Sequence, residues 1–304
     1  MNNVMKSKPS NYNLLLDSFC GSIYYAFHVL IHKKHDSNPT FDVYWANKFF
    51  EIASLKAISL WRIFKADSIL DFQYENGKML FKNDSFHDFV SASILARALL
   101  ENYLHLSYLI NNDIDKEEKE LRKLLWNRRM QNKSSTLAEL YGYDRVDKGK
   151  LNKDIPMLDS KIESNKYFIQ LVNSRTADKP LENINKLSTS KKIKLITNKD
   201  LWCYQTNEEI LESVKINKKL FDRLYKLASD FAHTSPVALG LFAEHHKTAT
   251  PKDLSKEFIS YAQAGLMFTL RDLLKIDKNA EAIMNETPNA YNCIKISESI
   301  FLEK

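Results

Sequence analysis

The scarcity of glycine and proline is the feature that most limits how this chain can fold. Its 304 residues include only 6 glycines and 7 prolines. Multistranded sheets and Rossmann-type units need many tight turns, and glycine supplies the backbone conformations that such turns require. A chain this poor in turn residues is better suited to helices joined by few connections. The sequence therefore predicts an all-α fold, a helical bundle of about seven to nine helices.

Apolar residues recur at helical spacing along most of the chain. The helices expected from this spacing cover approximately residues 11–34, 41–66, 84–110, 115–141, 153–172, 207–233, 251–276 and 288–302. Residues 69–82 instead alternate between apolar and polar side chains, and they contain Asn76-Gly77, the strongest hairpin signal in the sequence. This segment predicts a short β-hairpin, and a loop between two helices is the alternative.

Cysteine usage and hydropathy indicate the cellular compartment of such a protein. Cys20, Cys203 and Cys293 are far apart, odd in number and form no C-x-x-C pair. We therefore expect a reduced, cytoplasmic protein without structural disulfides. No stretch approaches 18 uncharged apolar residues, and the N-terminus lacks the apolar core of a secretory signal, so no membrane partner is expected.

The charge of the chain is concentrated in one segment. Residues 145–200 carry thirteen Lys and Arg against seven Asp and Glu, and this excess equals the formal net charge of +6 for the whole chain. The segment predicts one helix at about 153–172 followed by polar loops. We expect a single helical domain over residues 1–304, with 145–206 as a basic insertion or lid. RNA or another polyanion is the partner that this charge favours.

Arg97 and Glu101 lie in the middle of the most apolar predicted helix, in the sequence ARALLEN. At 100° per residue, Arg97 lies on the same side as Val90 and Leu104, and the opposite side, with Leu99, is also apolar. Both charges are therefore expected to be shielded from water, where pairing at i,i+4 offsets the cost of burial. One interpretation is a structural ion pair that fixes the helix register. The other is a polar cleft in which Arg97 binds a phosphate or carboxylate and Glu101 orients it.

A second polar group comes from the sequence YKLASDFAHTSP, residues Tyr225–Pro236. Pro236 is expected to stop the helix, which places His233 in its last turn. A protonated histidine is favoured there by the helix dipole. The alternative is a histidine that faces solvent without a function.

These two segments together resemble an uncharacterised family of bacterial all-helical proteins, known only as a domain of unknown function. The likeness is carried by ARALLENYLHLSYL and by Y-x-x-x-S-D-x-x-H-T-S-P, and it covers about residues 10–275 apart from most of 145–200. It implies that Arg97 and Glu101 meet Tyr225, Ser229 and His233 at one polar site.

A looser likeness is to the HEPN (higher eukaryotes and prokaryotes nucleotide-binding) helical bundles of toxins and antiviral proteins. Those carry an Arg and a His four to six residues apart, whereas Arg223 precedes His233 by ten residues here. The likeness implies a bacterial stress or phage-defence effector with an RNA-directed activity. As a ribonuclease, it would use His233 as general acid or base, Arg97 to stabilise a phosphate and Glu101 to orient Arg97.

The residues leave open whether the chain is an enzyme. The main alternative is a non-enzymatic helical module that binds a partner protein or a small anionic ligand, and a homodimer is also left open. No P-loop, G-x-G-x-x-G or G-x-S-x-G sequence is present, so no cofactor is expected.

Two further clusters each have a functional and an ordinary interpretation. Arg128 and Arg129 could contact RNA from a basic helix, or they could form a solvated helix face. The three residues His28, His32 and His35 have a spacing that suits a metal, but no carboxylate or cysteine stands near them in the sequence. An ordinary helix end is expected there, without a metal.

Overall fold

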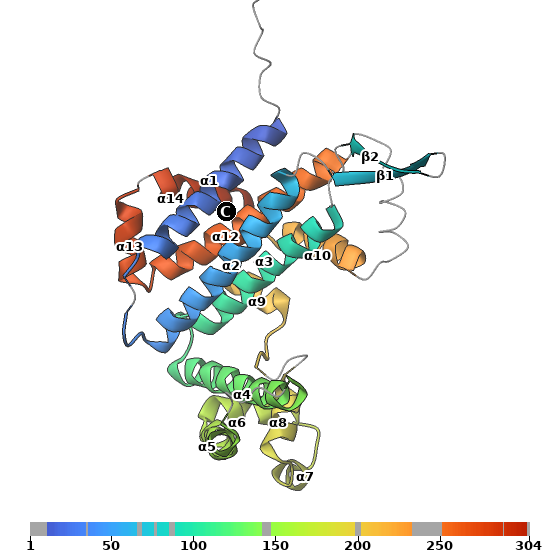
Figure 1. Ribbon diagram of the computed structural model, residues 1–304. Coiled ribbons are helices and arrows are strands. Elements are labelled where there is room, and N and C mark those ends of the chain that lie inside the picture. The colour runs from blue at the N-terminus through green and yellow to red at the C-terminus, as the bar shows by residue number, and fades with distance from the viewer. Residues whose placement is uncertain are drawn as a thin grey trace, which may run out of the picture. The chain divides into compact units, whose positions relative to one another are not determined.

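The computed structural model describes residues 11–34, 36–65, 69–75, 78–84, 89–141, 147–197, 202–232, 251–287 and 289–302. The chain divides into two compact units. The first comprises residues 1–107 and 214–304, and the second comprises residues 108–213. Figure 1 labels the elements of both units.

Long helices build the first unit. They are α1 (Asn11–His32), α2 (Phe41–Lys65), α3 (Phe89–Ile110), α10 (Lys218–Ala232), α12 (Pro251–Leu274), α13 (Lys278–Asn285) and α14 (Asn289–Phe301). The last residues of α3, from Tyr108 onward, belong to the second unit. The helices α1, α2 and α14 all pack against α12.

The helix α12 is the core of the first unit, because every residue from Tyr261 to Leu270 is buried. Its Gly265 lies directly against the backbone of α3. A Cβ atom at this position would approach the carbonyl carbon of Leu99 to 2.9 Å, which is closer than real Cβ atoms come. The absence of a side chain therefore lets α3 and α12 pack backbone to backbone.

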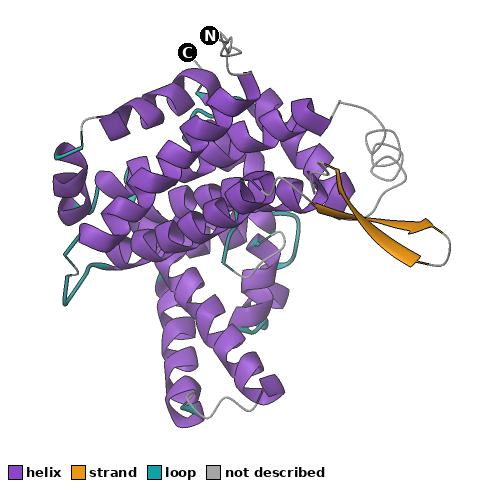
Figure 2. Cartoon of the chain, turned by 45° about the horizontal axis from the view of Figure 1, so that its top comes forward, coloured by secondary structure: helices purple, strands orange, loops and turns teal. Residues whose placement is uncertain are grey.

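Two strands, drawn in orange in Figure 2, also belong to the first unit. The strands β1 (Ile69–Glu75) and β2 (Lys78–Asp84) pair antiparallel, with Ile69 opposite Asp84 and Glu75 opposite Lys78. The hairpin expected at 69–82 is thus present within an otherwise helical fold. The all-α class is confirmed.

Shorter helices follow one long helix in the second unit. They are α4 (Lys116–Tyr141), α5 (Lys148–Ser164), α6 (Lys166–Arg175), α7 (Leu181–Asn185), α8 (Thr189–Ile196) and α9 (Asn207–Ser213). Arg122 of α4 is fully buried in this unit and donates to Glu118 at 2.6 Å and to the Tyr204 hydroxyl at 3.1 Å. Its guanidinium carbon also lies 4.2 Å from the ring centroid of Tyr108.

The helices are more numerous than the sequence indicated. The described residues form thirteen helices, whereas seven to nine were expected. Polar loops were expected after residue 172, but α6 extends to Arg175 and α7 and α8 follow it. The expected single helix also divides between α5 and α6 at Asn165, whose backbone N–H bonds to Ile162 and whose side chain caps Phe168.

Local capping also divides one other expected helix and starts an additional one. The helix expected at 207–233 breaks into α9 and α10 around Lys215, which has a φ of 57°, and Asn217 accepts from the first backbone N–H groups of α10. Asp277 caps α13, which precedes the helix expected at 288–302. The basic segment 145–206 lies within the second unit, and that unit also includes α4.

Candidate functional site

Arg97 of α3 meets Tyr225 of α10 across 128 positions of sequence. Its Nη2 donates to the Tyr225 hydroxyl at 2.8 Å, and its Cζ lies 4.2 Å from the centroid of the same ring. Its Nε donates to Glu101 Oε1 at 2.9 Å along α3. The guanidinium is therefore held by an ion pair, a hydrogen bond and a cation–π contact at once.

Hydrogen bonds to the surrounding helices fix both halves of this cluster. Asn102 of α3 donates to the carbonyl of Phe49 in α2 at 2.9 Å, and Asn102 is buried. The hydroxyl of Tyr261 in α12 donates to the carbonyl of Leu220 in α10 at 2.8 Å. The Arg97–Glu101–Tyr225 cluster thus stands on helices that the core of the first unit holds in place.

The ion pair is less buried than the sequence indicated. The Arg97 and Glu101 side chains are 21% and 30% exposed, so both are shielded from water only in part. The reason is where α12 packs on α3. Its Gly265 contacts Leu99, which lies about 200° around the helix from Arg97. Arg97 is therefore on a side of α3 that α12 leaves open.

Tyr225 keeps its proton in this setting. Partial burial raises the pKa of Tyr225, and the negative charge of Glu101 adds to that effect, while Arg97 opposes both. The ring of Phe221 stacks on Tyr225 with centroids 5.4 Å apart and fixes its orientation. The neutral phenol accepts from Arg97, and its own proton is directed towards the Glu101 carboxylate.

Lys56 of α2 adds a second cation that the sequence reasoning missed. Its Nζ donates to the carbonyl of Ala98 at 3.1 Å. Burial lowers the pKa of Lys56, and the nearby charge of Glu101 limits this decrease. A signal for Lys56 existed, because it interrupts an apolar helix as Arg97 does, but only the tertiary contact shows that both lie near Glu101.

The cluster combines groups that can recognise an anion. It holds two cationic side chains, one carboxylate and one neutral phenol in a half-buried setting. No described residue accepts a hydrogen bond from Nη1 of Arg97. That edge of the guanidinium is suited to a phosphate or carboxylate oxygen, with the other edges already holding the plane in position.

Ser229 and His233 are the other two residues that the sequence predicted for this site. Ser229 is half-buried on α10, one turn after Tyr225, and no hydrogen bond from its side chain is among those of the described residues. His233 is the next residue after the end of α10 at Ala232, and it lies outside the described residues.

Arg128 is engaged by the protein itself. Its side chain is 7% exposed, its Nε donates to Asp159 of α5 at 2.6 Å, and its Nη2 donates to Ser190 of α8 at 3.3 Å. A guanidinium on α4 that is tied to α5 and α8 in this way joins the second unit together, which argues against the RNA contact expected for it. Arg129 is half-exposed and also has interactions, so its role in binding stays a prediction.

The histidines of α1 lie on one side of the helix, with ring centroids of His28 and His32 4.5 Å apart. His35 lies outside the described residues. Among the residues that the structure describes, no cluster of His, Cys, Asp and Glu could hold a metal ion.

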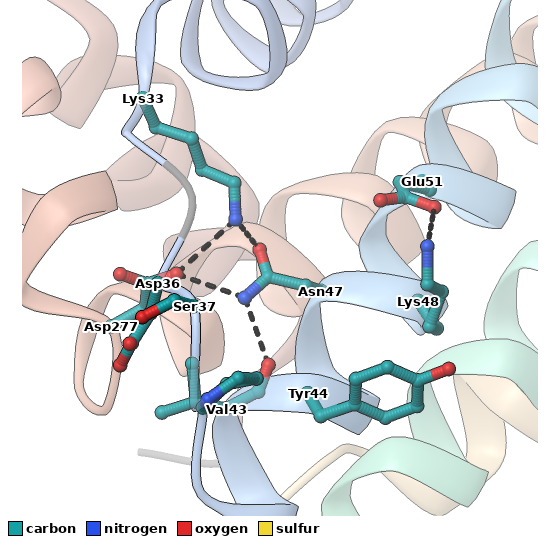
Figure 3. A pocket seen from close by; sticks show the side chains of 10 residues that line it. Lys33, Asp36, Ser37, Val43, Tyr44, Asn47, Lys48, Glu51 and Asp277 are labelled. Atoms are coloured by element: carbon teal, nitrogen blue, oxygen red, sulfur yellow. Dashed lines mark hydrogen bonds and ion pairs between the residues drawn. The ribbon is translucent and has the colours of Figure 1, made fainter.

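A separate pocket of about 320 Å³ lies where α1 ends and α13 begins (Figure 3). Lys33 donates to Asn47 and, at 3.2 Å, to Asp277, and Asn47 donates to Asp277 at 2.9 Å. Burial acts against the low pKa of Asp277, but the hydrogen bond from Asn47 and the charge of Lys33 outweigh it. Lys33, Asn47 and Asp277 thus satisfy one another's hydrogen-bonding groups, and Asp277 also caps α13. The floor of the pocket therefore joins α2, α13 and the end of α1.

Comparison with known proteins connects the chain to a family. The model of a family of unknown function (DUF5677) matches residues 74–250, which is more than half of the chain. This confirms the likeness to an uncharacterised family, and the matched region includes Arg97, Glu101, Tyr225, Ser229 and His233. No curated protein and no solved structure matches, so the looser likeness to HEPN bundles has no support.

Proposed function

The chain belongs to a family of unknown function, DUF5677, and from its site we propose that it binds an anionic group at Arg97, with RNA as the ligand. One observation carries this proposal. Arg97 is half-buried and is held by Glu101 and Tyr225 from two helices, while no described residue uses its Nη1 edge. A guanidinium fixed in this way is prepared for an oxyanion before the ligand arrives.

The half-buried setting strengthens such an interaction. An ion pair away from bulk water is screened less, and a charge-assisted hydrogen bond is about twice as strong as a neutral one. Lys56 adds positive potential near Glu101, while Glu101 limits the net charge of the cluster. The site is thus suited to one phosphate or carboxylate at a time.

For RNA, the proposal assigns a reaction as well as a binding site. His233 would take the proton of a 2′-hydroxyl as general base, or return a proton to the leaving oxygen as general acid. Arg97 would stabilise the charge that develops on the phosphate, and Glu101 would orient Arg97. A ribonuclease of this kind would serve as a bacterial stress or phage-defence effector.

The test measures binding and cleavage of a single-stranded RNA by the full chain. We expect Arg97→Ala to weaken binding and abolish cleavage, and His233→Ala to abolish cleavage while binding remains. Arg223→Ala is the matched control, because Arg223 lies two residues before Tyr225 on α10 but is 67% exposed and pairs with Glu257. An unchanged Arg97→Ala variant, or a wild-type chain that neither binds nor cleaves RNA, would contradict the proposal.

A non-enzymatic module is the second candidate, and one observation favours it. Glu101 and Tyr225 already occupy two edges of the Arg97 guanidinium, which leaves room for a single anionic group rather than a track of phosphates. In that case inorganic phosphate or diphosphate would bind to the wild type and not to Arg97→Ala in calorimetry. His233→Ala would then change neither binding nor any cellular phenotype.

A further inference from the structure

We propose that this protein forms a symmetric dimer through one apolar face of α1 and α2. This α1–α2 face comprises the exposed and half-buried apolar side chains of the two helices, which are Leu14, Cys20, Tyr24, Phe27, Ile31, Ile52, Leu55, Ile58 and Trp61, and the charged residues Asp17, Glu51 and Arg62 lie among them. The two helices pack side by side within the first unit (Figure 1). The inference is independent of the function proposed for Arg97.

The outward side of α1 is unusually apolar. The segment Leu14–His32 has a mean hydropathy of 1.5, and only 28% of this window is buried. Asp17 is its only Asp, Glu, Lys or Arg. A helix on the surface of a soluble protein normally turns a charged side to water, so this side has fewer charged residues than a solvated surface.

The face carries both a groove and protruding side chains. Apolar atoms of Cys20, Ile23, Tyr24, Phe27, Ile58 and Trp61 line a groove of about 220 Å³ between the two helices. Leu55 on α2 and Ile31 on α1 are 60% and 70% exposed. A face that has both features can be complementary to itself, as a twofold interface requires.

The dimensions of the face suit a second copy of the chain. The apolar stretch of α1 has 19 residues and is therefore about 28 Å long, and two packed helices are about 20 Å wide. The face thus covers on the order of 600 Å² on each copy. A standard stable interface buries about 800 Å² per partner, so the area is close to what a dimer needs.

Charge places the two copies antiparallel. Asp17 lies near the start of α1, and His28, His32 and Lys34 lie near its end. With the twofold axis close to Tyr24, Asp17 of one copy faces the end of the other that carries the exposed cation Lys34, and the two histidines there can donate hydrogen bonds to its carboxylate. A lipid surface could cover the same apolar area, but it would leave the exposed Asp17 carboxylate without a partner. Charge complementarity therefore favours a second copy over a membrane.

The experiment is the mass of the full chain in solution across a range of concentrations. We expect the wild type to sediment at twice its 35.4 kDa monomer mass, and Leu55→Lys to weaken the dimer at least about tenfold, because a charge enters an apolar interface. Leu140→Lys is the matched control, since Leu140 is 70% exposed on α4 of the second unit. The control must keep the mass of the wild type.

A charge exchange tests the antiparallel arrangement. Asp17→Lys alone should weaken the dimer, and adding His32→Asp should restore it. The exposed thiol of Cys20 gives an independent readout, because its labelling should slow as the protein concentration rises. The proposal is overturned if the wild type is monomeric at 100 μM, a value on the order of weak association constants. It is equally overturned if phosphatidylcholine vesicles bind the wild type and Leu55→Lys abolishes only that binding.

Discussion

Two arginine–glutamate pairs in this chain have the same i,i+4 spacing and different surroundings. The Arg97 side chain is 21% exposed, whereas that of Arg122 is 1% exposed and bonds to Glu118 and Tyr204. We expect Arg97→Ala to lower the free energy of unfolding by about 1–2 kcal/mol, as for a partly exposed pair with a cation–π contact. Arg122→Ala should cost about 3–5 kcal/mol, because it leaves Glu118 charged and buried. Urea unfolding of both variants gives the comparison, and equal losses would contradict it.

The pocket at Asp277 predicts a dependence of stability on acid pH. The folded state lowers the pKa of Asp277 below its value in the unfolded chain, which is about 3.9. Its contribution is therefore fully present above about pH 4 and is lost as the pH falls through the folded pKa. We expect unfolding between about pH 2 and 5 to show a steeper pH dependence for the wild type than for Asp277→Asn. Parallel curves would mean that Lys33 and Asn47 do not stabilise the carboxylate.

The site could be predicted from the sequence only in part, and the limit is physical. Arg97 and Glu101 are visible because charges within an apolar helix need partners, and family likeness added Tyr225. Lys56 interrupts an apolar helix in the same way, but its partner is a backbone carbonyl of α3 that no spacing rule identifies. The exposure of Arg97 and Glu101 could not be predicted either, since it depends on which side of α3 the helix α12 covers.

At the scale of helices, the packing of α3 on α12 depends on one missing side chain. A Cβ on Gly265 would meet the Leu99 backbone at 2.9 Å, and backbone cannot move aside cheaply. We expect Gly265→Ala to destabilise the fold by about 1–3 kcal/mol despite the better helix propensity of alanine. Gly21→Ala is the control, because a Cβ there meets nothing within 4 Å and should gain up to about 1 kcal/mol. Thermal unfolding that shifts both variants upward would contradict this account of the packing.

The long helices follow from periodicity, and the breaks between short ones do not. The described part of α1, α2 and α12 agrees with the expected spans to within a few residues, because each has an apolar stripe over many turns. The division between α5 and α6 rests on Asn165 alone, which serves as C-cap of one helix and N-cap of the next. A single polar residue within a polar segment gives no periodic signal, so the sequence predicted loops where short helices form.

At the scale of the whole molecule, the positive charge and the Arg97 cluster belong to different units. The basic segment lies in residues 108–213, and Arg97 lies in the first unit. The sequence predicted an insertion or lid at these residues, and composition does not reveal that α4 and the α5–α8 segment share a core. Arg128 shows this best, since it is a basic residue that holds α4 to Asp159 and Ser190.

The contribution of exposed lysines of the second unit to RNA binding can be tested on α8. Lys191 and Lys194 are exposed and three residues apart on one side of the helix, whereas Lys192 pairs with Glu163. If they bind RNA phosphates, the double variant Lys191→Gln/Lys194→Gln should reduce the slope of log affinity against log salt by about 0.7 for each phosphate that is no longer neutralised. Fluorescence anisotropy of a single-stranded RNA between about 50 and 200 mM salt measures this slope. The control Lys219→Gln/Lys278→Gln removes the same charge from exposed positions of the first unit. Equal slopes for both variants would show that net charge alone, and not the surface of α8, attracts the polyanion.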